Sequence, residues 1–303
     1  MINLYLYKHA RFHSQDTLFP EYSDTTPFSI QGIKRHCRLV DTPNADYFYI
    51  GQICETYDDK YSPILENSFN YLNEYHDKHI LDLEGDWPDK NAPSWVINCT
   101  KSLGASKKEH SIGKYCVRPC LSTLLMYLGK ENPTYEIEFP SHTSFGFIGL
   151  PDPHGVRFKM ARCINNINVK NQVMFNNMWC AKQSLDSNVV NNYIGILVNN
   201  LLSLCPRGTG SQSIRFYETC FFGRIPIIIS DSTVMNEEEA MKFAYRIQPD
   251  LNDNQMEQEL LKIYNTPYDE LVERCKMARN YFQETVVKYF QDPTLYFINF
   301  LQK

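Results

Sequence analysis

The stretch LLSLCPRGTGSQSIRFYETCFFGRIPIIISD, residues 201–231, carries the strongest fold signal in the 303-residue chain. An apolar run comes first and ends at Pro206. A loop of small residues follows, then a segment with helical spacing over residues 214–222, and finally a β-branched run over residues 225–229. This order predicts a βαβ unit whose second strand is buried on both faces.

The predicted helix is apolar nearly all the way round, and its polar residues form one narrow stripe. Arg215, Glu218 and Thr219 follow the spacing i, i+3, i+4, so they lie on the same face. Because unpaired charge is costly to bury, this stripe requires a partner. One interpretation is a bound ligand. The alternative is that Arg215 and Glu218 pair with each other and the loop only reverses the chain.

The loop before this helix has the features of a phosphate site. It offers small residues with free backbone N–H groups and a serine, Ser213, in N-cap position, where the helix dipole favours an anion. Arg207 and Arg215 add positive charge for a diphosphate. Glu218, one turn further into the helix, is placed to accept hydrogen bonds from a ribose diol. The pattern therefore favours a nucleoside diphosphate.

The patterns PRG, SxRxxE and GxIPxxxSD in this stretch resemble the C-terminal half of the exostosin-like glycosyltransferases, an inverting family of the GT-B type. The matched residues are Pro206, Arg207, Gly208, Ser213, Arg215, Glu218, Gly223, Ile225, Pro226, Ser230 and Asp231. In that family the segment holds the nucleotide diphosphate of a sugar donor. The donor-site residues that the resemblance and the loop imply are Arg157, Arg207, Gly208, Gly210, Ser211, Ser213, Arg215 and Glu218.

Arg157 enters this set through a second match. Residues 145–149, FGFIG, predict the first strand of a second domain, and a strand ending in FxG with an arginine about eight residues later is also similar to the exostosin-like pattern. Arg157 fits this spacing better than Arg162. By the resemblance Arg157 faces the donor diphosphate, and the alternative is a solvated helix arginine. A softer match to the family is DTPNADYFYIGQ, residues 41–52, a polar turn followed by a strand.

The segment HILDLEGDWPD, residues 79–89, carries the candidates for the acceptor side. It predicts a strand followed by a turn, and ligands of open α/β sheets bind at the carboxyl ends of strands. A carboxylate there can activate a hydroxyl, so we expect Asp86 first, then Glu84, as catalytic base, with the ring of Trp87 facing an acceptor sugar. The alternative is a turn in which Asp86 caps backbone groups and Trp87 packs.

Strands and helices alternate along the chain, which predicts an α/β protein with two Rossmann-like domains. By the resemblance these domains face a cleft, as in GT-B enzymes, and a C-terminal helix crosses back to the first domain. We expect an acceptor-binding domain over residues 1–140 and a nucleotide-sugar-binding domain over residues 141–290. Residues 291–303 are then the segment that packs on the first domain.

Composition excludes several classes of partner. The net charge is −5 and no basic block is present, so nucleic acid and anionic membrane surfaces are poor candidates. The ten cysteines show no metal-binding spacing and suit a reducing compartment. The start of the sequence does not have the form of a signal peptide, and no apolar run reaches the length of a membrane span. We therefore expect a cytoplasmic protein, bacterial or in the cytosol of a virus-infected host.

The sequence thus favours an inverting glycosyltransferase that moves a sugar from a nucleotide sugar, with UDP as the first choice, to a hydroxyl of a glycan acceptor. The sequence has no convincing DxD metal motif, because Asp58-Asp59 lies in a polar loop without a preceding strand. We therefore expect no metal and no cofactor. Two alternatives stay open. One is a catalytically inactive GT-B partner subunit, and the other is a sugar-nucleotide epimerase or hydrolase on a similar fold.

Overall fold

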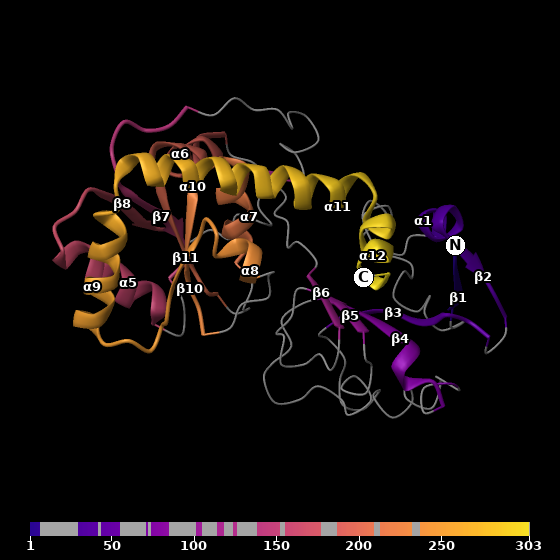
Figure 1. Ribbon diagram of the computed structural model, residues 1–303. Coiled ribbons are helices and arrows are strands. Elements are labelled where there is room, and N and C mark those ends of the chain that lie inside the picture. The colour runs from indigo at the N-terminus through magenta and orange to yellow at the C-terminus, as the bar shows by residue number, and fades with distance from the viewer. Residues whose placement is uncertain are drawn as a thin grey trace. The chain divides into compact units, whose positions relative to one another are not determined.

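The computed structural model divides the chain into two compact units. Unit 1 comprises Met1–Arg118 and Lys288–Lys303, and unit 2 comprises Pro119–Val287. Each unit contains a parallel β-sheet (Figure 1). The residues described are 1–6, 30–41, 44–54, 71, 74–84, 101–104, 114–117, 124–125, 138–151, 155–176, 187–208, 213–231 and 237–302.

Unit 1 has a parallel sheet in which the described strands follow the order β2-β1-β3-β4-β5-β6. These strands are β1 Ile2–Leu6, β2 Cys37–Leu39, β3 Tyr47–Cys54, β4 His79–Glu84, β5 Lys101–Gly104 and β6 Lys114–Val117. The chain runs from β1 to β2 on one side and then returns to β3 on the other. The direction of travel through the sheet therefore reverses between β1 and β3.

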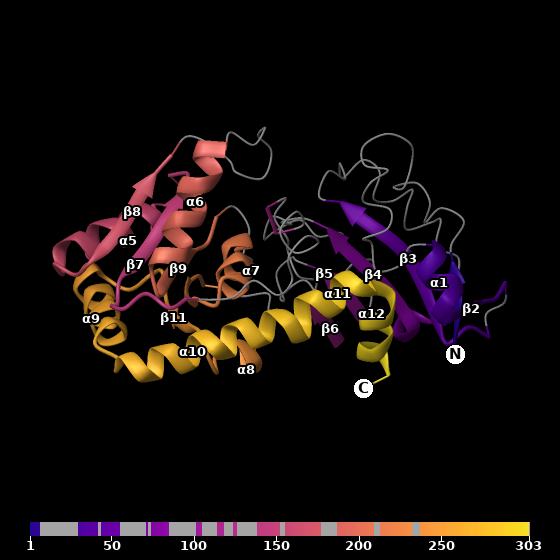
Figure 2. The same cartoon turned by 90° about the horizontal axis from the view of Figure 1, so that it is seen from above.

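The helical segments described in unit 1 are α1 Ile30–His36, η2 His76–Lys78, α11 Lys288–Gln291 and α12 Pro293–Leu301. α12 belongs to the core of this unit, because Phe297, Ile298 and Leu301 are buried in one cluster with Ile2 and Leu4 of β1. Figure 2 shows α12 beside α11 at the yellow end of the chain. The burial of three large apolar side chains stabilises the return of the chain to unit 1.

Unit 2 has a parallel sheet in the order β11-β10-β9-β7-β8. Its strands are β7 Phe145–Gly149, β8 Asn171–Phe175, β9 Leu202–Pro206, β10 Ile225–Ile229 and β11 Tyr245–Ile247. Every residue of β7, β9 and β10 is buried. Strands covered on both faces are expected to be continuously apolar, and the sequence of β10, IPIII, meets that condition. β8 is an edge strand, and each of its residues is half-buried or exposed.

The described helices of unit 2 are α5 Val156–Asn166, α6 Ser187–Asn199, α7 Ile214–Phe221, α8 Glu237–Ala240, α9 Asp253–Tyr264, α10 Tyr268–Tyr281 and the π-helical turn η4 Phe282–Val287. α5 packs against α9, and α7 packs against α10 (Figures 1 and 2). Right-handed crossovers to opposite sides of β7 cover opposite faces of a sheet. α5 therefore covers one face, and α6 and α7 cover the other.

The stretch 201–231 folds as its pattern predicts, as strand β9, helix α7 and strand β10. Gly223 ends the helix with a φ of 57°, a left-handed conformation that glycine adopts without strain. Elsewhere some element boundaries differ from the predicted ones. The sequence pattern predicts a helix over residues 191–200, whereas α6 begins four residues earlier, at Ser187. The pattern of residues 237–247 allows either a helix or a strand that begins late, and the structure has both, the short helix α8 and then β11.

Several predicted features lie outside the described residues. The sequence pattern also predicts a strand over residues 95–99, helices over 62–75 and 121–128, and a polar linker over 129–143. The strand and most of the helices and the linker lie outside the described part of the chain. The boundary at residue 140 and the cleft between two domains accordingly stay predictions. The α/β class with parallel sheets is confirmed. Among the described helices, none has the length and apolar composition needed to cross a membrane.

Candidate functional site

The candidate site lies where β7 and β9 separate. β7 leads to β8 on one side, whereas β9 leads to β10 on the other, so the chain segments after β7 and β9 turn in opposite directions. Ligands of open parallel sheets bind at such a switch point, outside the carboxyl ends of the strands. The predicted donor residues of unit 2 all follow these two strands. Topology therefore explains how Arg157, distant in sequence, comes close to the segment around Gly208.

The backbone hydrogen bonding between β7 and β9 ends before the strands do, which leaves room for a side chain between them. The two strands pair only at Phe145 and Gly146. The Ile148 carbonyl points toward the β9 side, since the carbonyl of the next residue, Gly149, accepts a hydrogen bond on the β8 side. The Nη2 group of Arg215 donates to the Ile148 oxygen. The guanidinium of Arg215 thus takes the place of a ladder hydrogen bond.

Two aromatic rings hold this guanidinium. Its central carbon, Cζ of Arg215, lies 4.7 Å from the ring centroid of Phe147 and 5.1 Å from that of Tyr193. A planar guanidinium stacks on aromatic faces and keeps its N–H groups in a fixed fork. The Nη1 atom of Arg215 is buried and has no hydrogen-bond partner among the residues that the structure describes. A buried donor of this kind is costly to leave unpaired, so an anionic ligand at this point would satisfy it.

Glu218 is held by a different group. Only 2% of the residue is exposed, and its Oε2 atom accepts a hydrogen bond from the Tyr193 hydroxyl. No salt bridge joins Arg215 to Glu218 within the described part of the chain, although the helical spacing would permit one. The alternative in which these two residues only satisfy each other is therefore wrong. Each has its own partner outside α7.

Arg157 joins the site from the segment after β7. Its Nη1 atom donates to the Leu150 carbonyl at 2.7 Å, and its Cζ lies 6.0 Å from the ring centroid of Phe147. The residue is half-buried, which is not the solvated helix position of the alternative interpretation. A Cβ atom added to Gly208 would lie 2.9 Å from Nη2 of Arg157. Gly208 therefore permits the close approach of the arginine to the backbone that follows β9.

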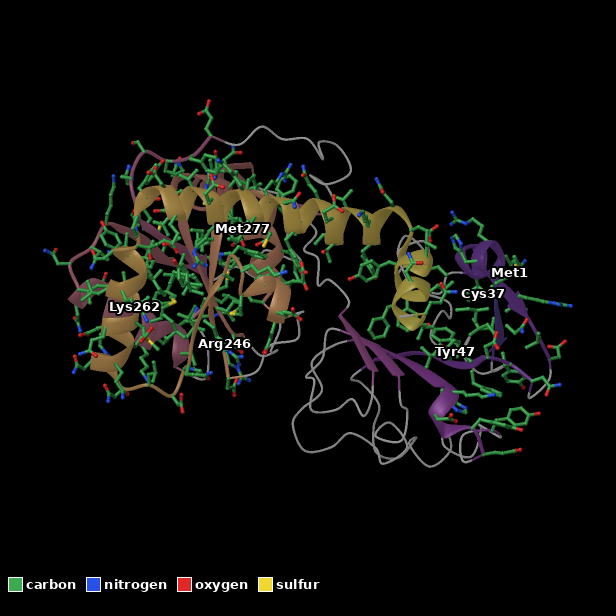
Figure 3. The ribbon with its side chains drawn as sticks, viewed as in Figure 1. Met1, Cys37, Tyr47, Arg246, Lys262 and Met277 are labelled. Atoms are coloured by element: carbon green, nitrogen blue, oxygen red, sulfur yellow. The ribbon has the colours of Figure 1, made fainter. Side chains whose placement is uncertain are left out.

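Arg207 is held at the end of β9 by an acidic partner. Its Nη1 atom lies 2.6 Å from Oδ2 of Asp231, and the two side chains are 14% and 53% exposed. Arg246 of β11, labelled in Figure 3, fixes the backbone of Asp231 by donating to its carbonyl oxygen at 3.0 Å and forms a 3.0 Å ion pair with Glu237. This chain of charges orients Arg207 at the carboxyl edge of the sheet.

Ser213 occupies the N-cap of α7, as predicted, but its side chain makes no capping hydrogen bond. The first N–H groups of a helix have no partner within the helix, and a cap, water or ligand must satisfy them. Ser213 is thus available as a further donor or acceptor at the start of α7. Gly210 and Ser211, the other two predicted loop residues, lie outside the described residues.

The thiols near the site are not nucleophiles. Burial raises the pKa of Cys205 to about 12 and raises the pKa of Cys220 well above its ordinary value. The thiolate is the reactive form of cysteine. Cys205 instead packs beside Thr219, whose hydroxyl donates to Oγ of Ser203 at 2.9 Å. Thr219, the third member of the polar stripe on α7, therefore contacts β9 rather than a ligand.

The predicted catalytic and acceptor residues belong to unit 1. Glu84 is the last residue of β4, and its backbone is paired with Cys54 of β3. Asp86 and Trp87 lie outside the described residues. The roles of Asp86, Glu84 and Trp87 stay predictions.

Sequence reasoning did not find three residues that shape the site. Phe147 is a buried strand residue, Tyr193 lies on the inner side of an apolar helix, and Arg246 belongs to a short strand. Each has the pattern of an ordinary core or edge residue. Their contacts with Arg215, Glu218 and Asp231 depend on tertiary packing, so no local sequence signal could have revealed them.

Three guanidinium groups from three segments therefore gather around the end of β7 and β9, next to a buried carboxylate. Residues 134–268 match the model of one protein family. The family is the RXYLT1 C-terminal domain. This exostosin-like family covers the whole described site of unit 2, and the resemblance found in the sequence is confirmed for this segment. The match supports a glycosyltransferase function.

No curated protein matches the chain. Solved structures with a similar fold include the N-terminal domain of Candida albicans trehalose-6-phosphate phosphatase, at 9% identity over 90% of this chain and 72% of that one, with a TM-score of 0.51. A mutant of S. aureus TarM has 12% identity over 87% of this chain and 52% of that one, with a TM-score of 0.41. A glycosyltransferase from Rickettsia africae has 8% identity over 99% of this chain and 98% of that one, with a TM-score of 0.45.

This chain thus spans about half the length of the TarM chain. At identities this low the likeness concerns the fold alone. The similarity to the Candida albicans domain supports the α/β architecture around the RXYLT1-type segment.

Proposed function

We propose that the protein is an inverting, metal-independent glycosyltransferase that moves a sugar from a UDP-sugar to a hydroxyl of a glycan acceptor. The observation that carries the proposal is the guanidinium of Arg215, which enters the gap between β7 and β9 with its buried Nη1 atom unsatisfied among the described residues. A diphosphate is the ligand that best fits such a donor at a switch point.

In the proposed reaction, positive charge acts on the leaving group. The bond between the anomeric carbon and the diphosphate oxygen breaks, and negative charge grows on the departing nucleoside diphosphate. Arg157, Arg207 and Arg215 with the N-terminal N–H groups of α7 stabilise that charge, because fixed donors aimed at developing charge lower a barrier. These cations replace the divalent metal that other transferases use for the same purpose.

The acceptor side of the proposal rests on unit 1. The acceptor hydroxyl loses its proton to a carboxylate, Asp86 in the first instance and Glu84 otherwise, while its oxygen attacks the anomeric carbon. Attack opposite the leaving diphosphate inverts the configuration at that carbon. Trp87 provides an apolar ring for the face of an acceptor sugar.

The donor site is tested by calorimetry with UDP-, GDP- and CMP-sugars on the full-length chain, in buffer with EDTA and again with Mn²⁺. We expect binding of a UDP-sugar with the same affinity in both buffers. Arg215→Ala should weaken it by about ten- to a hundredfold, because hydrogen bonds between charged groups contribute about 1.5–3 kcal/mol.

Arg162→Ala is the matched control, since Arg162 lies on the same sheet-covering helix as Arg157 but forms an exposed 2.7 Å ion pair with Asp253. The affinity of Arg162→Ala for the UDP-sugar should equal that of the wild type. Equal binding by wild type and Arg215→Ala would refute the donor site, and binding that requires Mn²⁺ would refute metal independence. A chain that binds no nucleotide sugar would instead fit an inactive partner subunit.

A further inference from the structure

One residue of unit 2 contacts both of the chemically different groups of the candidate site. Tyr193, from the middle of α6, donates its hydroxyl hydrogen to Oε2 of Glu218. The face of the same ring lies against the guanidinium of Arg215, with 5.1 Å between Cζ and the ring centroid. Only 6% of Tyr193 is exposed, so both contacts are made inside the protein.

From this arrangement we infer that Tyr193 is a positioning residue that sets the preference of the site for ribonucleotides over deoxyribonucleotides. The inference rests on the proposed function, in which Glu218 accepts hydrogen bonds from the ribose diol and Arg215 binds the diphosphate. The inference adds Tyr193 of α6 to the groups that determine ribose binding. Tyr193 itself is not expected to touch the reacting atoms.

The physical argument begins with the carboxylate. The terminal torsion of a glutamate side chain is broad, so an unrestrained carboxylate adopts many orientations. The Tyr193 hydroxyl occupies one lone pair of Oε2, and a carboxylate has about four such sites, so the remaining ones can accept from a ligand. Because the orientation of Glu218 is fixed before the ligand arrives, less ordering entropy is lost on binding.

The ring of Tyr193 has a separate effect. Cζ of Arg215 lies within 5.1 Å of the ring centroids of both Tyr193 and Phe147, and these cation–π contacts help to hold the guanidinium. Tyr193→Phe removes the hydroxyl and keeps the ring. The two halves of a nucleotide can therefore be tested independently, because the variant disturbs Glu218 and leaves the support of Arg215 in place.

The experiment measures the affinities of UDP, 2′-deoxy-UDP and inorganic pyrophosphate for the full-length protein by calorimetry. The wild type should prefer UDP over 2′-deoxy-UDP by about tenfold, the effect of one hydrogen bond to a charged group. Tyr193→Phe should reduce this preference to about threefold or less and leave the dissociation constant of pyrophosphate unchanged.

Tyr245→Phe is the control, since this tyrosine of β11 also has a hydroxyl contact to a side chain, 3.2 Å from Oγ1 of Thr266. It should keep the wild-type preference. A second test places Tyr193→Phe in a Glu218→Gln background. If Tyr193 acts through Glu218, the effect of the tyrosine substitution on the UDP preference should disappear there.

The outcomes separate the two proposals. If the wild type binds UDP and Tyr193→Phe has the same UDP preference, the inference is wrong and the donor site stands. If Tyr193→Phe weakens UDP, 2′-deoxy-UDP and pyrophosphate by the same factor, with a lower melting temperature, the residue is only structural and the inference is again wrong. If the wild type binds no nucleoside diphosphate, the proposed function falls, and the inference falls with it.

Discussion

At the scale of single residues, the site depends on side chains that are fixed before any ligand is present. The guanidinium of Arg215 contacts the rings of Phe147 and Tyr193 and donates to the Ile148 carbonyl. Arg207 is oriented by the carboxylate of Asp231. Fixed charged donors of this kind lose little entropy on binding, which is why a site can stabilise a diphosphate without a metal.

Gly208 provides the sharpest prediction at this scale. A Cβ at this position would lie 2.9 Å from Nη2 of Arg157, which is the flexible end of a long side chain. Gly208→Ala should therefore displace the arginine at little cost in stability and weaken UDP-sugar binding by about tenfold, the loss of one charged hydrogen bond. Calorimetry measures the binding, and thermal unfolding measures the stability.

The control is Gly195→Ala in the interior of α6, where an added Cβ meets only Nδ2 of Asn199 at 3.9 Å. It should raise the stability by about 0.5–1 kcal/mol, because alanine suits a helix better than glycine, and leave affinity unchanged. Wild-type affinity in Gly208→Ala would show that Arg157 does not contact the donor.

At the scale of secondary structure, the described helices differ in how they begin: α5, α7 and α10 have no side-chain cap, and of these three only α7 has a hydroxyl at its N-cap. α9 begins with a capping box formed by Asn252 and Gln255, and α12 is capped by Asp292. At α7, Ser213 has a suitable hydroxyl and does not use it as a cap. The start of α7 lies at the switch point, where the dipole of a helix favours an anion.

The cap of α12 gives a prediction about stability and pH. Burial by itself raises the pKa of Asp292, but the Leu295 N–H, which donates to its Oδ1 at 2.9 Å, and the nearby His36 and Arg35 outweigh this and lower the pKa overall. Because the folded-state pKa lies below the unfolded value, Asp292 stabilises the fold above the unfolded pKa, and this stability is lost as the pH falls through the folded pKa.

Asp292→Asn keeps a capping oxygen and removes the charge. At pH 7 it should lower the free energy of unfolding by about 1 kcal/mol, a typical value for a helix cap or dipole interaction. The difference from the wild type should shrink as the pH falls below about 4, where the aspartate is protonated in the unfolded chain. Urea unfolding at a series of pH values measures it. A difference that does not change with pH would contradict the assigned role of the charge.

At the scale of the whole molecule, two units with parallel sheets are formed from one chain, and the last helix is built into the core of the first unit. The proposed donor-binding groups of unit 2 lie in the segment that matches the RXYLT1-type model. The proposed base is supplied by the other unit. The proposed reaction therefore uses residues of both units, whereas the proposed donor site uses residues of unit 2 alone.

This division predicts different kinetic effects for the two units. Asp86→Asn should lower kcat by about a hundredfold or more, the usual contribution of general base catalysis, while donor affinity measured by calorimetry stays unchanged. Glu84→Gln should have a much smaller effect. Loss of turnover only in Glu84→Gln would exchange the two roles, and full turnover in both variants would place the base elsewhere.

The sequence by itself determined the elements of unit 2 that have a strong periodic pattern. β7, α5, β9, α7 and β10 start or end within one residue of their predicted limits, because a continuous apolar run or a helical period leaves few alternatives. It also indicated Arg157, Arg207, Ser213, Arg215 and Glu218 through spacing and family resemblance. Boundaries without such a pattern moved, as at the start of α6 and around α8.

Only the tertiary structure decided what these residues contact. Arg215 and Glu218 have a spacing that permits an ion pair, yet strand order and helix packing bring Ile148 to one and Tyr193 to the other. A local pattern records which face of a helix a side chain occupies, but not which distant segment covers that face. The partners that orient the site come from β7, α6 and the segment after β10, so folding alone brings them together.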